Sequence, residues 1–354
     1  MDCRICKIRE MAQSAEDERC KNDNLKGLDN PILDKWNVLK KIGEYVRDEQ
    51  SNRMVFHVRS FPLFIQAIGS VKYNCAKSDK GEESGFRIVY RGQNSLMPST
   101  DPFQPSLYRK HDGRYPKQEN VDRFVGTAVS LLQKYSENMG RLDKRVVEGV
   151  IQHYGAGSRW IDAVDNIWTA LWFACHKVWA GNKNASYVHY ERRNPYLESA
   201  QHPYCYVLLL GVNTSGMTDQ KTPGLMGNSR YEFLDLRYAL PSFYIRPHVQ
   251  HGVLVRSMDS KGHPKFDMSD LLKSVIRIDL KNALDWIGNG GSFATSSMFP
   301  APAFDTGFDE LLRTATNMKS REAELLWKGK NCTSEETNEL NRLKKHKLLL
   351  QTIC

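Results

Sequence analysis

The sequence predicts an α/β (or α+β) domain in which a single mixed β-sheet is covered by helices. Short runs of β-branched and aromatic residues, such as FRIVY at 86–90, alternate with longer amphipathic segments, such as 120–139. The first pattern is typical of strands and the second of helices packed on a sheet. Hydrophobic residues make up 40% of the 354 residues and charged residues 26%, as in globular proteins. The chain is therefore long and apolar enough to bury a substantial core.

Five segments are expected to form the central sheet. The continuous apolar run 204–212 (YCYVLLLGV) indicates a buried central strand. The segment 275–280 (VIRIDL) alternates between apolar and polar residues, as a strand does. The complete set of expected strands comprises 86–90, 158–164, 204–212, 251–256 and 275–280.

Helices are expected between these strands. The spacing of apolar residues predicts helices at 62–71, 120–139, 142–151 and 306–328. Asn166 can cap a further helix, and because apolar residues surround that helix almost completely we expect it to be buried. Residues 181–203 form a polar, asparagine-rich insert, which we expect to be a surface loop.

The chain is expected to have three parts. Residues 1–54 form a polar segment with one helix, 55–315 form the main domain, and 316–354 form a helical tail. The helical ends are candidates for contact with a partner protein or for self-association, but ordinary packing against the domain is the favoured explanation.

Net charge and cysteine usage narrow the class of protein. The formal net charge of +9 suits nucleic acid, nucleotide or phosphate ligands, although an excess spread along the chain also serves solubility. No apolar run approaches the ~20 residues of a membrane-spanning helix, and no leader is recognisable at the amino end. We therefore expect a cytoplasmic protein with reduced thiols and no membrane contact. Cys3 and Cys6 form a lone CxxC, so no metal site is expected.

The stretch 150–175 carries a dense set of polar side chains beside the buried helix. The set comprises His153, Tyr154, Arg159, Asp162 and Asn166. Polar groups placed against so apolar a helix must pair with one another or bind a ligand. The sequence leaves both explanations open.

Two other segments carry candidate contacts for an anion. Arg91 follows the strand 86–90, and a guanidinium can bind a phosphate or a carboxylate through two parallel hydrogen bonds. Gly92 beside it would let the backbone approach a ligand closely. A buried ion pair between Arg91 and Asp162, or another acid of the core, is the alternative explanation, and the two are compatible. Arg109, which follows a Pro-Ser-Leu-Tyr segment, is the second candidate.

The central stretch resembles the core motif of the FRG domain family, which runs roughly Gln-His-x-Gly-x-Pro-Thr-Arg-Leu-Leu-Asp-Trp-Thr and reads QHYGAGSRWIDAV at 152–164. The naming motif of that family, Phe-Arg-Gly, is matched by Tyr90-Arg91-Gly92, which Gln93 follows. A later signature, an Arg followed by Gln-x-Gly, is matched by Arg246 and Gln250-His251-Gly252. The resemblance extends over roughly residues 55–315. This chain departs from the pattern at Ala163-Val164, which replace Trp-Thr, and at Gly157, which replaces Pro.

The three signatures each lie at a strand end, so they can converge on one cleft. Arginines, an amide and a histidine suit a ligand with phosphate and ribose or base edges. The residues expected to bind such a nucleotide-type ligand are Tyr90, Gly92, Gln93, Arg109, His153, Tyr154, Ser158, Arg159, Asp162 and Arg246.

The order of these parts is similar to that of mono-ADP-ribosyltransferases, in which an early Arg steadies NAD and a late Glu or Gln stabilises the oxocarbenium. By this analogy Arg91 and Gln250 are catalytic candidates, Glu232 is the alternative late acid, and NAD is the implied cofactor. The implied enzyme is an NAD-dependent ADP-ribosyltransferase or NAD glycohydrolase acting as a toxin or in phage defence. The rival hypothesis is a non-catalytic module that binds a nucleotide, a nucleic acid or a protein.

Overall fold

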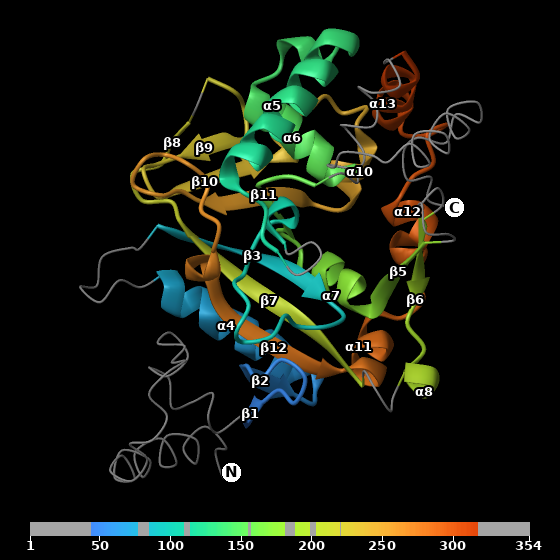
Figure 1. The fold of residues 1–354 in the computed structure, drawn as a ribbon. Helices are drawn as coiled ribbons and strands as arrows, with labels where there is room; N and C mark the ends of the chain where they lie inside the picture. Colours follow the sequence, from blue (N-terminus) through green and yellow to red (C-terminus); the bar gives the residue numbers. More distant parts are fainter. Residues whose placement is uncertain are drawn as a thin grey trace, which may run out of the picture.

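The computed structural model describes residues 44–76, 85–109, 114–154, 157–180, 188–198, 203–219 and 221–317. The predicted mixed sheet is confirmed within this part of the chain, where ten strands pair in the order β1-β2-β12-β7-β3-β4-β11-β10-β9-β8 (Figure 1). Neighbouring strands are antiparallel except β2 and β12, which are parallel. The amino-terminal segment with Cys3 and Cys6, and the tail after residue 317, lie outside the described residues.

The five predicted strands are present, with changed ends. The strands of the large sheet are β1 (Glu44–Arg47), β2 (Met54–Val58), β3 (Phe86–Gln93), β4 (Ile161–Val164), β7 (Tyr204–Asn213), β8 (Thr218–Asp219), β9 (Leu225–Gly227), β10 (Tyr231–Asp235), β11 (Gly252–Ser257) and β12 (Leu272–Asp279). β4 begins three residues later than expected because Ser158 and Arg159 bond to other segments instead of the sheet. β3 extends through Arg91 to Gln93 because these residues pair with β7.

The expectation that 181–203 is only a surface loop was wrong. Residues of this insert form strand β6 (Val188–Arg192), which pairs with β5 (His176–Ala180) in a separate two-stranded sheet, and helix α8 (Pro195–Glu198). Tyr190 of β6 packs its ring on Phe299, with ring centroids 4.2 Å apart. The insert therefore contributes to the packed structure.

Helices cover one face of the large sheet. The helices are α4 (Phe61–Ala76), α5 (Gln118–Tyr135), α6 (Lys144–His153), α7 (Ile167–Cys175), α9 (Leu236–Ala239), α10 (Ile245–Val249), α11 (Leu280–Ile287), α12 (Thr295–Met298) and α13 (Thr306–Asn317), with short 3-10 turns at Ser106–Tyr108, Met139–Arg141, Ser269–Leu271 and Gly291–Phe293. In Figure 1, α5 and α6 lie over the end of the sheet that contains β9, β10 and β11. One core forms beneath these helices, and α4, α7 and α11 form a second core with β2, β3, β7 and β12.

Loops cover the other face of the sheet. The core on that face joins inward side chains of β3, β7 and β11 to Leu96, Phe103, Met268 and Leu271, which come from two connecting segments. Because side chains alternate along a strand, successive residues of β3 belong to different cores. Tyr90 packs with the helices and Val89 with the loops. By the same alternation, Arg91 and Gln93 face the loop side.

The buried helix predicted after Asn166 is confirmed as α7. The Asn166 side chain accepts hydrogen bonds from the backbone N–H groups of Trp168, at 2.8 Å, and Thr169, at 3.3 Å. These bonds satisfy two of the N–H groups that a helix leaves without a partner at its start. Ala170, Leu171 and other residues of α7 are completely buried. The cap and the apolar surface together fix α7 against β3.

Gly92 is needed for this contact. A Cβ built on Gly92 would overlap the carbonyl oxygen of Ala170 and lie 2.7 Å from the backbone nitrogen of Ala174. Both atoms belong to the backbone of α7, so they cannot move aside without shifting the helix. The glycine of the Tyr-Arg-Gly motif therefore lets the strand approach the helix, whereas the sequence suggested close approach to a ligand.

We predict that Gly92→Ala lowers the free energy of unfolding by about 3 kcal/mol, because the added methyl group overpacks the strand–helix contact. Gly126→Ala is the matched control, since a Cβ there meets no atom within 4 Å on the exposed side of α5. That change should raise stability by about 0.5–1 kcal/mol. Urea denaturation of both variants measures the difference, and equal effects would contradict the packing explanation.

Candidate functional site

The candidate site lies where strands β3 and β4 separate. The two strands pair only at Tyr90 and Val164, whereas β3 pairs with β7 on its other side along its whole length, from Phe86 to Gln93. Arg91 fills the gap, because its Nη1 donates a hydrogen bond of 2.5 Å to the backbone carbonyl oxygen of Asp162. Of the two explanations that the sequence left open for Arg91, the ion pair is replaced by a bond to the backbone. The guanidinium thus supplies a hydrogen bond that backbone pairing between β3 and β4 would otherwise provide.

A cavity of about 330 Å³ opens beside this guanidinium. It is lined by Arg91, Gln93, Ser95, Leu96, Met97, Asp101, Pro102, Phe103, Gln104, Arg109 and Tyr115. We call it the arginine cavity. Its size lies at the lower end of the range for small-molecule sites, about 300–1,000 Å³. Three residues that the sequence analysis selected, Arg91, Gln93 and Arg109, meet here.

The outer wall of the arginine cavity is held in place by Arg53. Its guanidinium donates to the carbonyl oxygens of Met97 at 3.0 Å, Pro98 at 2.9 Å and Asp101 at 2.7 Å. Burial lowers the pKa of Arg53, an effect that the nearby carboxylates of Asp267 and Asp101 oppose. The wall is therefore organised before any ligand arrives. The sequence analysis did not select Arg53, because nothing local connects it to residues 97–101.

The guanidinium groups of Arg91 and Arg109 repel each other electrostatically at the arginine cavity. Burial lowers the pKa of Arg91, the Asp162 carboxylate opposes this shift, and the charge of Arg109 lowers the pKa further. Within the described residues, no carboxylate forms an ion pair with Arg109. Asp101 is the acidic residue among those that line the cavity. Because the cationic charge exceeds the anionic charge here, the cavity favours an anion.

A second polar cluster lies behind Arg91, on the helical side of the strand gap. Its residues are Asp162 on β4, His153 at the end of α6, Arg246 on α10 and Tyr190 on β6. Burial and the Asp162 charge raise the pKa of Tyr190 to about 12, while Arg246 and Arg91 act in the opposite direction. Tyr190 therefore lies within electrostatic reach of the other charged members. We call this set the inner cluster.

Several polar atoms of the inner cluster are buried without a hydrogen-bond partner among the described residues. Both ring nitrogens of His153 are in this state, and its Nδ1 lies 3.9 Å from the Asp162 carboxylate, which is too far for a hydrogen bond. Nε and Nη2 of Arg246 also have no acceptor. The Arg246 guanidinium packs on the rings of Tyr154 and Phe308, each centroid 4.6 Å away. Buried polar groups without partners are uncommon and often mark functional sites.

Gly252 makes room for the His153 ring. A Cβ on Gly252 would lie 2.7 Å from Cε1 of the imidazole. The Gln-x-Gly signature therefore packs directly against the histidine of the Gln-His motif. Gln250 is 3% exposed, and its Nε2 donates to the Met298 carbonyl oxygen at 2.7 Å. This bond anchors the signature to the carboxy-terminal part of the domain, and Gln250 is not among the residues that line the arginine cavity.

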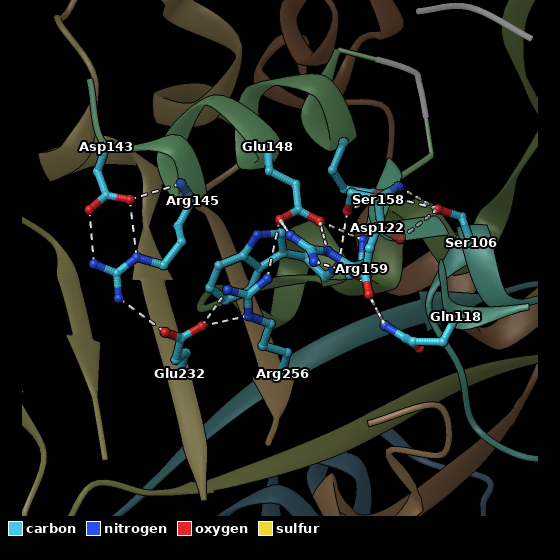
Figure 2. A network of polar contacts seen from close by, with 12 residues as sticks. Ser106, Gln118, Asp122, Asp143, Arg145, Glu148, Ser158, Arg159, Glu232 and Arg256 are labelled. Carbon is cyan, nitrogen blue, oxygen red and sulfur yellow. Dashed lines mark hydrogen bonds and ion pairs between the residues drawn. The ribbon is translucent and has the colours of Figure 1, made fainter. Parts of the chain in front are cut away.

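Arg159 and Glu232 belong to a different network, on α5, α6, β10 and β11 (Figure 2). Arg159 pairs with Glu148 and Asp122, each at 2.8 Å, and not with Asp162. Glu232 accepts from Arg256 at 2.5 Å and from Arg145 at 3.0 Å. The Arg256 guanidinium also lies 3.9 Å from the centroid of the Trp160 ring. We call this set the ion network.

The remaining selected residues also have internal partners. Ser158 is completely buried, and its hydroxyl donates to Gln152 Oε1 at 2.9 Å. Ser106 donates to the same oxygen at 3.1 Å, so Gln152 joins the Pro-Ser-Leu segment to the central motif. The Tyr154 hydroxyl donates to the Asp305 carboxylate at 2.9 Å. Tyr90 is 2% exposed and lies in the core beneath α7.

The structure thus divides the selected residues into groups. The arginine cavity contains Arg91, Gln93 and Arg109, and the inner cluster contains His153, Asp162 and Arg246. The others contribute to packing or to separate bonds, namely Tyr90, Gly92, Tyr154, Ser158, Arg159, Glu232 and Gln250.

Sequence reasoning missed Gln104, Tyr115 and Tyr190. Gln104 and Tyr115 flank Arg109 and line the same cavity, so their proximity to that arginine was the available signal. Tyr190 lies in the insert that was expected to be a loop. No group of three or more metal-binding side chains gathers within the described ranges. Among the helices of those ranges, none has the length and apolar character needed to cross a membrane.

The fold and the site define an α/β domain with a basic cavity at a gap between two strands of its sheet. Residues 86–183 match the family model of the FRG domain, and this segment of the chain is an FRG domain. The match includes β3, the Tyr-Arg-Gly motif and the central Gln-His motif, and it covers less of the chain than the resemblance over 55–315 suggested. Neither the curated proteins nor the solved structures include one that matches the chain.

We predict that the ion network makes stability depend on pH. Glu148 is buried, which by itself raises its pKa, but bonds and charges of Arg159 and Arg256 hold the pKa below its usual 4.5. Its stabilising contribution is therefore complete above about pH 4.5 and is lost as the pH falls through the lower folded-state pKa. Glu148→Gln should cost about 3 kcal/mol at pH 7, because it removes an ionic partner from the partly buried Arg159 and from the buried Arg256.

Urea denaturation at several pH values between 3 and 7 tests this prediction. The difference between wild type and Glu148→Gln should shrink below about pH 4.5. Glu137→Gln, at an exposed position after α5, should change stability by less than about 0.5 kcal/mol throughout. A constant difference between wild type and Glu148→Gln across this range would contradict the assignment.

Proposed function

We propose that the FRG domain of this protein binds an anionic, nucleotide-type ligand in the arginine cavity. The observation that carries the proposal is the presence of two guanidinium groups, those of Arg91 and Arg109, on one cavity. A guanidinium carries about five N–H donors, so the single bond from Arg91 to Asp162 leaves further donors for a ligand. A phosphate group would relieve the repulsion between the two cations.

The size and lining of the arginine cavity support a ligand with both polar and apolar parts. Leu96 and Phe103 are buried in the loop-side core, and both reach the cavity. Such a mixture of apolar walls with few charged groups is typical of small-molecule sites. The volume of about 330 Å³ suits a mononucleotide-sized ligand better than a long polymer. We therefore favour a small nucleotide over nucleic acid.

Binding is better supported than ADP-ribosyl transfer. The two candidates for the late catalytic position, Glu232 and Gln250, lie outside the arginine cavity and are occupied by bonds to other residues. Asp101 is the acidic residue that lines the cavity, whereas Asp162 belongs to the inner cluster and bonds to Arg91 through its backbone carbonyl oxygen. If NAD is consumed, Asp101 is the acid that the cavity offers.

We predict that Arg109→Gln weakens binding of ADP and of inorganic pyrophosphate about tenfold, because it removes one charge-assisted contact. Affinity should also depend less on salt in this variant. Arg141→Gln removes the same charge at an exposed position on another part of the surface and should leave binding unchanged. Isothermal titration calorimetry measures both variants. Equal affinities for wild type and Arg109→Gln would refute the proposed site.

Incubation with labelled NAD separates binding from turnover. We expect NAD to remain intact, because neither Glu232 nor Gln250, the two candidates for the late catalytic position, lines the cavity. Release of nicotinamide would instead support an enzyme, and Asp101→Asn would then identify the acid if it abolishes release while ADP binding persists.

A further inference from the structure

Helix α4 carries a row of exposed apolar side chains. Phe61 is 39% exposed, Ile65 40% and Tyr73 46%. Together with Gly69 they occupy every fourth position of the helix, so they form one of the ridges along its surface. We call these four residues the apolar row. A Cβ built on Gly69 meets no atom within 4 Å, so among the described residues nothing lies over that position.

Two tryptophans widen the apolar row at the start of α4. The Phe61 ring stacks on Trp168 of α7, with centroids 5.6 Å apart, and meets Trp286 of α11 edge-on at 5.9 Å. Both tryptophans are only partly buried. Scattered exposed apolar residues need no explanation, but a contiguous apolar surface marks a contact with another segment or protein. Aromatic side chains, tryptophan above all, carry much of the binding energy at such contacts.

The chain that precedes β1 is attached beside the apolar row. Glu44, the first residue of β1, pairs with His57 near the end of β2. Its carboxylate also lies 3.1 Å from the guanidinium of Arg59, which comes two residues before Phe61. The segment before Glu44 is therefore tethered at the amino end of α4. A short tether gives a segment an effective concentration of about the millimolar range at a neighbouring surface.

The tethered segment 31–42, PILDKWNVLKKI, has the sequence of an amphipathic helix. It lies outside the described residues. Its apolar residues recur at helical spacing, namely Ile32, Leu33, Trp36, Leu39 and Ile42. Pro31 suits the first position of a helix and Gly43 the position after its end. Twelve residues of helix span about 18 Å, and the apolar row from Phe61 to Tyr73 spans about the same length.

We propose that segment 31–42 docks as a helix on the apolar row, antiparallel to α4. Because Glu44 lies at the amino end of α4, a segment that covers the row has to run toward the carboxy end of that helix. In this arrangement Trp36, at the middle of the segment, falls near Gly69, where a large side chain meets the smallest one. A helix of this length is marginal in water by itself, so the contact supplies the stability that it lacks.

Hydrogen exchange of the segment in the full chain tests the proposal. Docking predicts that the amides of 31–42 exchange at least about tenfold more slowly than in an isolated peptide of the same sequence, because exchange requires undocking. Ile65→Glu places a charge on the apolar row and should return exchange to within about threefold of the peptide rate. Gln66→Glu is the matched control, since it adds the same charge at an exposed position beside the row and should keep the protection.

Trp36→Glu is the reciprocal variant, on the segment itself. Glutamate favours helix more than tryptophan does, so a loss of protection in this variant reports loss of docking and not of helix propensity. We expect the protection of 31–42 to fall as far as it does in Ile65→Glu. Thermal melting establishes that the domain of each variant is folded.

Three results would overturn the proposal. The first is exchange of 31–42 at the peptide rate in the wild type. The second is protection that persists in both Ile65→Glu and Trp36→Glu. The third is protection that rises with protein concentration together with the sedimentation coefficient, because a second copy of the chain would then cover the apolar row.

Discussion

The hydrogen bond from the Arg91 guanidinium to the carbonyl oxygen of Asp162 is the constraint on which the site depends. Where β3 and β4 stop pairing, this carbonyl group loses the backbone partner that a continuous sheet would supply. A buried carbonyl without a partner is costly, and the arginine meets that need with one of its donors. The same bond fixes the position of the guanidinium at the edge of the arginine cavity. A structural role and a binding role are therefore combined in one side chain.

Packing accounts for the glycines of the motifs. Gly92 allows β3 to contact the backbone of α7, and Gly252 allows β11 to accept the His153 ring. Gln152 adds a third connection, because it holds Ser106 and Ser158 together. In this chain the three motif segments therefore fit directly against each other in space. Arg91 is the residue of the naming motif that packing alone does not explain.

The sequence was sufficient to predict the fold class and much of the sheet. The apolar run of β7 and the cap at Asn166 are local signals, and local signals determine where elements form. It was insufficient for side-chain partners, since these join segments far apart in the chain. Arg159 pairs with Glu148 and Asp122, and no spacing rule connects the three.

The positions of Ala163 and Val164, where the family pattern has Trp-Thr, are core positions of the sheet in this chain. Ala163 is 3% exposed and Val164 is 5% exposed, and each belongs to a hydrophobic core. Val164 pairs with both Tyr90 and Gly252 at the start of the strand gap. These positions form part of the packed sheet here, so the change does not remove a residue that lines the arginine cavity.

The central claim is that the cavity beside the β3–β4 gap holds a phosphate between two guanidiniums. A crystal structure determined with ADP tests it most directly. The account predicts phosphate density within hydrogen-bonding distance, about 2.7–3.2 Å, of both Arg91 and Arg109, with the Arg91–Asp162 bond intact. Phosphate bound elsewhere, or an Arg91 guanidinium turned away from the cavity, would contradict it.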